Sequence, residues 1–184
     1  MSTSQGFDQS ILKNISSPSD KERAFKLILS FFERKVYYQA RRMVLNHDDA
    51  NDIVQNIFIK VWLHLDEFRG DSAFSTWLFR IASNETLNYI ASQKRRRHLS
   101  IDSGLSHEVE QMHSHDGFSG NEIQLKLHQA IQKLPPKQRM VFNLKYFDEL
   151  PYHEMSKILG TSEGALKASY HHAVKKIENF LIGN

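Results

Sequence analysis

The sequence predicts an all-helical protein of two small domains joined by a flexible linker, and three observations support this. Apolar residues recur at intervals of three and four in the long segments, which is helical spacing. Pro, Gly, Ser and Asn stand where such segments begin or end. The apolar pattern stops over residues 99–121 and then resumes. We therefore expect an extension over 1–19, domains over 20–98 and 122–184, and a linker over 99–121.

The composition fits a globular protein and excludes several classes of function. The chain has 184 residues, 40% of them apolar and 24% charged, which allows one or two packed domains. It has no cysteine, which excludes disulfides, thiolate zinc sites and cysteine nucleophiles and fits a cytoplasmic protein. The first residues lack the basic head and apolar stretch of a secretory signal. No run approaches the roughly 20 apolar residues of a membrane span.

The first helix is expected from Ser19 or Asp20, as the capping residue, to about Leu45. A turn at Asn46–Asp48 precedes a second helix, in which apolar residues from Ile53 to Leu65 repeat at one and three positions. The polar side of this helix carries Asp49, Asp52, Gln55 and Asn56. Acidic residues in a first turn are favoured by the helix dipole alone, so Asp49 and Asp52 need no binding partner to explain them.

The segment Phe68–Asn88 combines a Phe-Arg-Gly-Asp-Ser loop with a helix that is apolar around most of its circumference and continues to about Lys94. One polar stripe remains, formed by residues four apart: Thr76, Arg80, Asn84 and Asn88. Asparagine is a mediocre residue inside helices because its amide competes for backbone hydrogen bonds. The stripe therefore suggests a surface that reads a ligand, although a solvated stripe over a core helix explains the spacing equally well.

Charge is unevenly distributed around the end of this helix. Residues 94–98 read Lys-Arg-Arg-Arg-His, whereas residues 99–122 hold five acids and no Lys or Arg. The basic cluster suits phosphate contacts, and equally the negative end of a helix dipole. The linker also holds His107, His113 and His115. Without cysteines or carboxylates at a fixed helical spacing, we favour a solvated linker over a metal site.

The second domain ends in a helix-turn-helix pattern. Helices are expected from Glu122 to Leu134 and from Lys137 to Phe147, separated by Pro135-Pro136. A third helix starts at Pro151, and Gly160-Thr161-Ser162 forms the turn into a last helix from Glu163 to about Leu181. That helix has an apolar stripe from Leu166 to Phe180. The opposite side is polar and mildly basic, with small residues that permit close approach to a groove: Gly164, Lys167, Ala168, His171, His172 and Lys175.

Together these segments resemble the extracytoplasmic-function (ECF) sigma factors, the minimal two-domain members of the bacterial sigma-70 family. The similarity runs from about residue 20 to residue 182. The family's region 2 is matched by DDANDIVQNIFIKVW (Asp48–Trp62) and FRGDSAFSTWLFRIASNETLNY (Phe68–Tyr89). Its region 4 is matched by LPPKQRMVF (Leu134–Phe142) and LPYHEMSKILGTSEGALKASYHHA (Leu150–Ala173). Two extended motifs in the right order make the resemblance specific.

The resemblance implies roles for the residues of region 2. Asp52, Gln55 and Asn56 would dock on the clamp helices of the largest RNA polymerase subunit, with Asn56 in place of the family's usual Glu. A loop and its adjoining helix would capture an unpaired base of the minus-10 element, reading its edge while offsetting the lost stacking. Basic residues behind them would follow the phosphates. The implied minus-10 set is Phe68, Arg69, Gly70, Asp71, Ser72, Ala73, Arg80, Asn84, Arg95, Arg96 and Arg97. Trp77 is expected to be core rather than a stacking platform.

The resemblance to region 4 places five residues in the minus-35 major groove, namely Lys167, Ala168, His171, His172 and Lys175. Here the chain departs from the family pattern. The usual Ser-Arg-Leu-x-Arg-Ala-Arg is replaced by ASYHHAV, so all three arginines are absent. Arginine is the commonest reader of guanine, and histidine carries little charge near neutral pH. Lys175 and Lys176 are expected to contact phosphate.

The function that these resemblances imply is transcription initiation without chemistry or cofactor of its own. The protein would bind core RNA polymerase, read minus-10 and minus-35 elements and promote melting. Its acidic linker would pass through the RNA exit path. An anti-sigma factor, often membrane-anchored in the family, would inhibit the protein by binding the surfaces that are buried between its two domains. Two alternatives remain: a dimeric helix-turn-helix regulator, which leaves the Asn84 unit unexplained, and a histidine-rich metal hydrolase, which lacks ligand spacing and a nucleophile–base pair.

Overall fold

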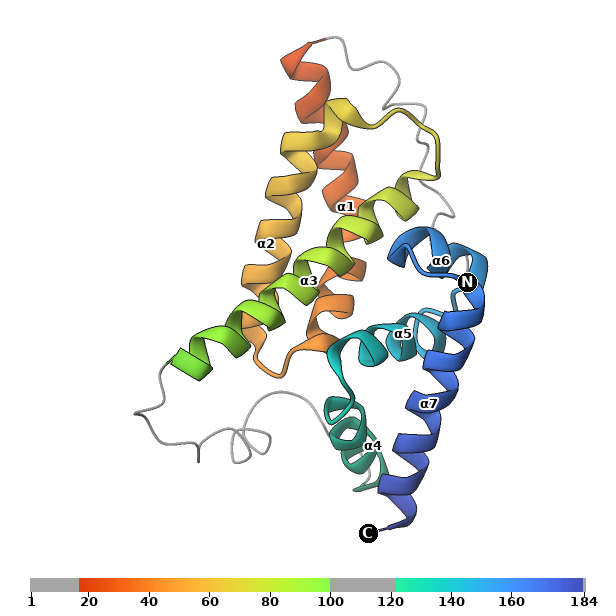
Figure 1. The fold of residues 1–184 in the computed structure, drawn as a ribbon. Coiled ribbons are helices and arrows are strands. Elements are labelled where there is room, and N and C mark those ends of the chain that lie inside the picture. The colour runs from red at the N-terminus through yellow and green to blue at the C-terminus, as the bar shows by residue number, and fades with distance from the viewer. Residues whose placement is uncertain (1–16, 100–121, 184) are drawn as a thin grey trace.

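The computed structural model describes residues 17–99 and 122–183, and every regular element in those ranges is helical. The expected N-terminal extension up to residue 16 and the expected linker over 100–121 lie outside the described residues. Figure 1 shows two groups of helices. We call α1–α3 the N-terminal bundle and α4–α7 the C-terminal bundle. The all-helical prediction is confirmed.

The N-terminal bundle consists of α1 (Pro18–Met43), α2 (His47–His64) with a short 3-10 helix (Leu65–Glu67), and α3 (Phe74–Leu99). The predicted cap at Ser19 or Asp20 is wrong: Ser17 caps α1, and its Oγ accepts from the Asp20 backbone N–H at 3.2 Å. Pro18 occupies the first turn, where no backbone donor is needed. The predicted turn precedes α2, and Asn46 is the N-cap of that helix: its Oδ1 accepts from Asp48 N–H at 2.9 Å.

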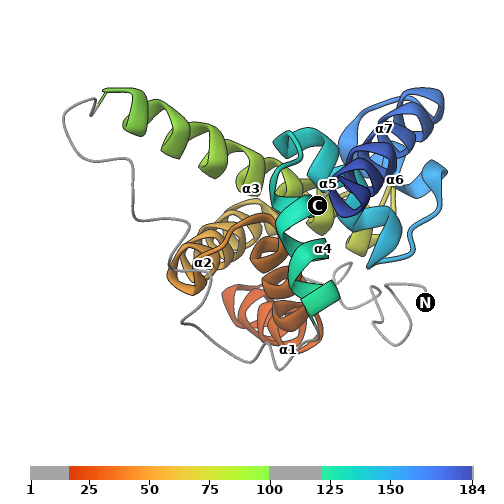
Figure 2. The ribbon, with the colours of Figure 1, turned by 90° about the horizontal axis from the view of Figure 1, so that it is seen from below.

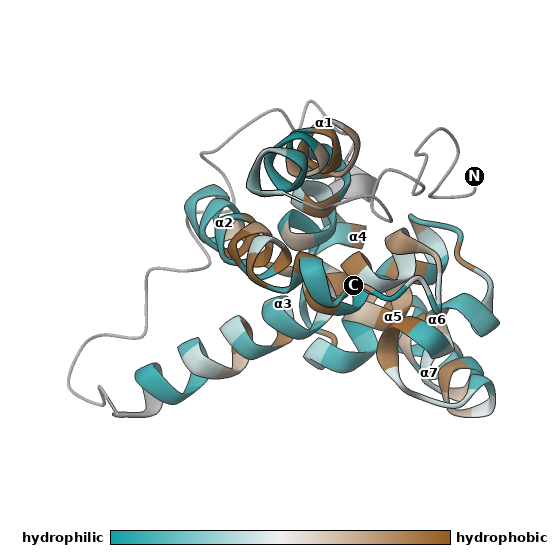
Figure 3. Cartoon of the chain, turned by 90° about the horizontal axis from the view of Figure 1, so that it is seen from above, coloured by the Kyte–Doolittle hydropathy of each residue, from teal (hydrophilic) through white to brown (hydrophobic). Residues whose placement is uncertain are grey.

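The interior of the N-terminal bundle is predominantly apolar. Ile28, Ile57 and Val61 are completely buried, and the Phe32 and Phe74 rings pack with centroids 5.7 Å apart. These residues lie on the helical stripes that the sequence predicted for α1 and α2. In Figure 2 the C-terminal half of α3 extends beyond the other helices, and Figure 3 shows that this projecting part is largely hydrophilic.

The C-terminal bundle consists of α4 (Glu122–Gln132), α5 (Pro136–Tyr146), α6 (Tyr152–Leu159) and α7 (Glu163–Ile182). Pro135 caps α5, and Pro151, predicted as the first residue of α6, is instead its cap. The turn between α6 and α7 forms as predicted. Gly160 has φ of +62°, which favours glycine, and Ser162 Oγ accepts from Ala165 N–H at 3.3 Å. A separate core joins α4, α5 and α7 around Ile131, Leu134, Phe142, Ala173 and Ile177.

The two bundles pack against each other, with α6 lying on α3 and α5 lying on the end of α1 (Figures 1 and 2). Apolar side chains from both bundles form one continuous cluster across this boundary. The C-terminal bundle contributes Met140, Val141, Leu144, Leu150, Met155, Ile158 and Leu166. We call the contact of α5 and α6 with α1 and α3 the bundle interface.

Candidate nucleic-acid interface

The loop before α3 is held at its two ends and open between them. Phe68 is half-buried, and its ring meets those of Phe74 and Trp77 at 5.3 and 5.6 Å between centroids. Gly70 has φ of +79°, a conformation that strains any residue with a Cβ. Arg69, Gly70, Asp71 and Ala73 are exposed. The sequence thus builds a fixed turn that presents charged and backbone polar groups at the N-terminus of a helix.

The polar stripe that the sequence placed on α3 is not uniform. Thr76 is buried, with 8% of its surface exposed, whereas Asn84 and Asn88 are exposed to solvent. Arg80 donates from Nε and Nη2 to the backbone carbonyl oxygen of Lys157, at 3.1 and 2.7 Å. Of the stripe, only Asn84 and Asn88 present polar side chains away from the C-terminal bundle. Trp77 packs against the apolar core, as predicted.

The basic residues at the end of α3 lie on its projecting half. Lys94, Arg95 and Arg96 are exposed, whereas the side chain of Arg97 lies outside the described residues. A helix end that extends away from the bundle presents its exposed cations where a polyanion can approach them. The loop leads directly into α3, and Asn84 and these basic residues follow it along that helix.

The predicted docking residues of α2 lie exposed along one side of that helix. Asp52, Gln55 and Asn56 are all solvent-accessible. Asp49 is a different case, because its Oδ1 accepts from the Tyr89 hydroxyl at 2.7 Å and so ties α2 to α3. Burial, followed by the hydrogen bond to Asp49, raises the pKa of Tyr89, so its hydroxyl stays protonated as the donor in this contact.

Two apolar residues on the same side of α2 were missed by the sequence reasoning. Ile59 is 56% exposed and Leu63 is 61% exposed. They follow Asp52 and Asn56 at helical spacing, so the polar patch continues into an apolar one. The signal was present in the sequence, because both residues fall off the stripe that the other apolar residues of α2 form. Exposed apolar residues beside polar ones are typical of a protein-binding surface.

The outward face of α7 is formed as predicted. Lys167, Ala168, His171, His172 and Lys175 are exposed, while Leu166, Ala173 and Ile177 are buried. The Tyr152 ring at the start of α6 lies beneath two cations, with Lys145 Nζ 5.2 Å and Lys167 Nζ 5.6 Å from its centroid. These contacts bring Lys145, in the last turn of α5, and Lys167, near the start of α7, to the same aromatic ring. Lys176 Nζ donates a hydrogen bond to Gln138 Oε1 at 2.8 Å.

The described part of the chain contains no group of three or more His, Asp or Glu side chains placed to hold a metal ion. The linker histidines lie outside the described residues. Within the described ranges, no helix has the length and apolar character needed to cross a membrane. A helix-turn-helix unit packed on a second bundle, with exposed basic and amide residues on both, has the features of a DNA-binding protein.

Comparison with known proteins gives the family. The Sigma-70 region 2 model matches residues 31–96, and the Sigma-70 region 4 model matches residues 124–177. The ECF RNA polymerase sigma-E factor of Escherichia coli K12 is 32% identical over 182 residues, 94% of this chain and 93% of that protein. The RNA polymerase sigma-H factor of Pseudomonas aeruginosa is 30% identical over 185 residues, 95% of this chain and 93% of that protein. The chain belongs to the ECF sigma factors of the sigma-70 family.

Solved structures agree with the fold. The sigma factor RpoE of Bartonella quintana, solved in complex with the anti-sigma factor NepR, has a TM-score of 0.71 at 23% identity. That match covers 86% of this chain and 97% of the other. CnrH, solved with the cytosolic domain of CnrY, has a TM-score of 0.69 at 22% identity and covers 96% of this chain and 98% of the other.

Proposed function

We propose that this chain is an alternative sigma factor that binds core RNA polymerase, recognises minus-10 and minus-35 promoter elements and promotes DNA melting. The observation that carries the proposal is the presence of both sigma-70 regions, in order, in one chain whose proposed contact residues are largely exposed. The family consists of regulatory transcription factors rather than enzymes. We propose that this protein likewise has no catalytic step or cofactor, and that it acts in the cytoplasm, where it meets the polymerase.

Polymerase binding is assigned to the exposed side of α2. Asp52, Gln55 and Asn56 supply polar groups, and we add Ile59 and Leu63 because they continue the same side. An apolar centre with polar neighbours is the composition that stable protein interfaces use. Because Asn56 stands where the family usually has Glu, this contact has one charge fewer. The exposed side chains of Ile59 and Leu63 offer apolar contact area that compensates for it.

Minus-10 recognition is assigned to the loop 68–73, Asn84, Arg80 and the basic end of α3. The open loop offers backbone groups, and the Asn84 amide has both a donor and an acceptor for a base edge. An extruded base costs a few kcal/mol of stacking, which such contacts can offset. Arg95, Arg96 and Arg97 would follow the phosphates beyond the captured base.

Minus-35 recognition is assigned to α7. Ala168 allows close approach to the groove, and Lys167, His171, His172 and Lys175 supply donors on one exposed side. Neutral imidazoles donate fewer and weaker contacts than guanidinium groups. We therefore expect this half of the promoter to contribute less affinity than in relatives that carry arginines.

An anti-sigma factor is the proposed regulatory partner. The solved structures of RpoE and CnrH, both with this fold, are complexes with NepR and with the cytosolic domain of CnrY, respectively. We extend that kind of partner to this chain as a proposal. The division of the chain into an extension, region 2, an acidic linker and region 4, at residues 19, 98 and 121, is proposed with it.

Promoter opening in the presence of core polymerase tests the function. Promoters would be selected from random DNA with reconstituted holoenzyme, and melted thymines would then be mapped by permanganate. We expect opening only when core polymerase and this protein are both present. Stable site-specific binding by a dimer of the protein alone would favour the free helix-turn-helix regulator instead. About one equivalent of zinc in the purified protein would reopen the metal-enzyme alternative.

Asn84→Ala tests the minus-10 site, and Asn88→Ala is its matched control on the same exposed stripe of α3. We expect Asn84→Ala to reduce opening about tenfold or more and to relax sequence choice at one minus-10 position, while core binding is unchanged. Asn88→Ala should have little effect on either. Equal loss of core affinity in the Asn84 variant would mean that the residue has a structural role.

A further inference from the structure

The hydroxyl of Tyr89 is the middle member of a hydrogen-bonded chain that joins α2 to α3. It donates to Asp49 Oδ1, in the first turn of α2, at 2.7 Å, and it accepts from Gln93 Nε2, one turn further along α3, at 2.9 Å. All three side chains are half-buried, so water competes with these bonds less than it does at an open surface. The hydroxyl satisfies both neighbours only when its proton points at the carboxylate, which gives the chain one defined arrangement.

A second polar contact holds α3 against α2 at a different point. Lys60 Nζ donates to Glu85 Oε1 at 2.5 Å. On α2, Lys60 lies about three helical turns after Asp49, whereas on α3 Glu85 lies about one turn before Tyr89. A helix held at one point can pivot there, whereas two separated contacts restrict its angle. The Tyr89 contact and the Glu85 contact together therefore restrict the angle of α3 on α2.

The direction of the projecting half of α3 depends on how its base is held. This half extends beyond the other helices (Figure 2) and carries the exposed Arg95, six residues after Tyr89. Six residues span about 9 Å of helix, so a tilt of about 10° at Tyr89 would move the backbone of Arg95 by about 1.5 Å. A hydrogen bond to a phosphate oxygen tolerates a range of only about 0.5 Å in donor–acceptor distance, so such a tilt is enough to break it.

We propose that Tyr89 is a positioning residue for minus-10 recognition: held between Asp49 and Gln93, it sets the direction in which α3 presents its basic end to the phosphates of the melted strand. This inference rests on the proposed function. Asp49 lies about one turn before Asp52, which is assigned above to polymerase docking. The chain of hydrogen bonds thus joins the helix assigned to polymerase to the helix assigned to DNA, and Tyr89 acts through the orientation of α3.

Tyr89→Phe tests the proposal because it removes the hydroxyl and keeps the ring that packs against the core. Promoter binding by reconstituted holoenzyme would be measured at several salt concentrations. The slope of log affinity against log salt reports phosphate contacts, at about 0.7 for each contact on a single strand. We expect promoter affinity to fall roughly three- to tenfold and the slope to decrease by about 0.7 or more, while the Kd for core polymerase is unchanged. A weaker affinity with an unchanged slope, or an equal loss of core affinity, would overturn the proposal.

A double-mutant cycle with Arg95→Ala asks whether the two residues act through one contact. If Tyr89 positions Arg95, the Tyr89→Phe variant has already lost much of what Arg95 contributes. We expect Arg95→Ala to weaken promoter binding several-fold in the parent protein and clearly less in the Tyr89→Phe variant. Additive effects would overturn the proposal. So would an Arg95→Ala variant that binds promoter as the parent does, because no phosphate contact would then need positioning.

Substitutions at Asp49 separate this role from an effect of the helix dipole. Asp48 and Asp49 are both acids in the first turn of α2, where the dipole favours either one. Asp49→Ala removes the acceptor of the Tyr89 hydroxyl and should reproduce the smaller salt slope, whereas Asp49→Asn keeps an acceptor oxygen and should restore the parent slope. Asp48→Ala removes an exposed acid from the same turn and is the matched control, which should keep the parent slope. A slope that follows the number of acids, rather than the acceptor at position 49, would overturn the proposal.

Failure of the proposed function and failure of this inference look different in these measurements. The first appears as a parent protein that binds no core polymerase and whose mixture with polymerase opens no promoter. The second appears as a functional parent protein whose Tyr89→Phe and Asp49→Ala variants keep its salt slope.

Discussion

The interior of the N-terminal bundle and the bundle interface are both buried, yet they are built from different chemistry. Around Phe32 the interior is closely packed with aliphatic and aromatic side chains, and burial of such surface stabilises at about 25 cal/mol per Å². The bundle interface mixes apolar residues with Gln39, Arg42, Arg139 and Asn143, and each carries an orphaned polar atom, that is, a buried side-chain atom without a hydrogen-bond partner among the described residues. The first region is stabilised mainly by apolar packing, whereas the second also buries polar atoms that lack hydrogen-bond partners.

Phe32→Ala should have the largest effect because it leaves a cavity in the closely packed interior of the N-terminal bundle. The ring is 1% exposed and contacts those of Phe74 and Phe79, with centroids 5.7 and 6.5 Å away. We expect the free energy of unfolding to fall by about 3–5 kcal/mol, measured by urea denaturation followed by circular dichroism. Phe31→Ala, one position along at 41% exposure, is the matched control and should cost far less. Equal losses for the two variants would contradict the contrast.

Arg139→Ala should have the next largest effect because this side chain connects the bundle interface to the C-terminal bundle. Its guanidinium donates to the Met43 carbonyl across the interface and to the Gln132 and Leu134 carbonyls within the C-terminal bundle. Burial lowers the pKa of Arg139 to about 10, so the group remains charged at neutral pH.

Truncation leaves these acceptors buried without donors, and we expect a loss of about 2–3 kcal/mol in the same urea assay. Arg139→Lys keeps the charge but loses the planar fork, so it should recover only part of the loss. Full recovery by lysine would show that the charge of Arg139, rather than the geometry of its guanidinium, stabilises these contacts.

Gln39→Leu tests the bundle interface through an expected small change in the free energy of unfolding. The substitution replaces a 1% exposed amide with an apolar side chain of similar size, removing the orphaned Oε1 together with the 3.0 Å contact to Ser83. The two consequences oppose each other, so we expect stability to change by less than about 1 kcal/mol. The measurement is urea denaturation beside the parent protein. A loss as large as that of Phe32→Ala would mean that the interface is as specifically packed as the interior.

The sequence could predict those features, such as turns and helix faces, that depend on residues close together in the chain. Gly160 and Ser162 define the turn into α7 by their own backbone and side-chain chemistry, and helical spacing identified the buried and exposed sides of that helix. Ser17 was missed as the cap of α1 because Ser19 and Asp20, also good capping residues, lie within three positions of it. Pro18 favours Ser17, because proline suits the first position of a helix. Local pattern could not predict that Arg80 meets the Lys157 carbonyl or that Thr76 is buried. Both depend on packing between segments far apart in the chain.

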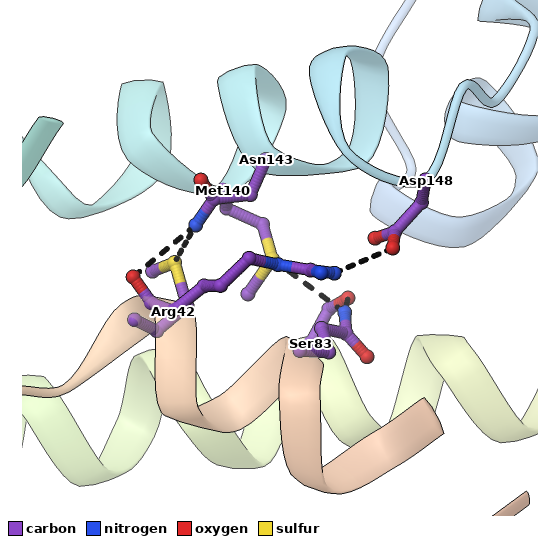
Figure 4. A network of polar contacts seen from close by, with 7 residues as sticks. Arg42, Ser83, Met140, Asn143 and Asp148 are labelled. Atoms are coloured by element: carbon purple, nitrogen blue, oxygen red, sulfur yellow. Dashed lines mark hydrogen bonds and ion pairs between the residues drawn. The ribbon is translucent and has the colours of Figure 1, made fainter. Parts of the chain in front are cut away.

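The smallest expected effect is a pH dependence carried by Asp148, which is about three-quarters buried beside Arg42 (Figure 4). Burial raises the pKa of Asp148 above its ordinary value, and the nearby Arg42 offsets only part of that rise. The carboxyl therefore holds a proton more readily in the folded protein than in the unfolded chain. Its contribution to stability is complete below the ordinary aspartate pKa of about 4 and is lost as the pH rises through the raised value.

The free energy of unfolding, measured by urea denaturation at a series of pH values, should accordingly include a contribution from Asp148 that falls modestly as the pH rises above about 4. Asp148→Asn should remove that contribution, whereas Asp66→Asn, at the exposed pair with Lys21, should leave it unchanged. A contribution from Asp148 that rises over the same range would mean that the attraction of Arg42 outweighs the burial of Asp148. The interface would then be stabilised by the ion pair between Arg42 and Asp148.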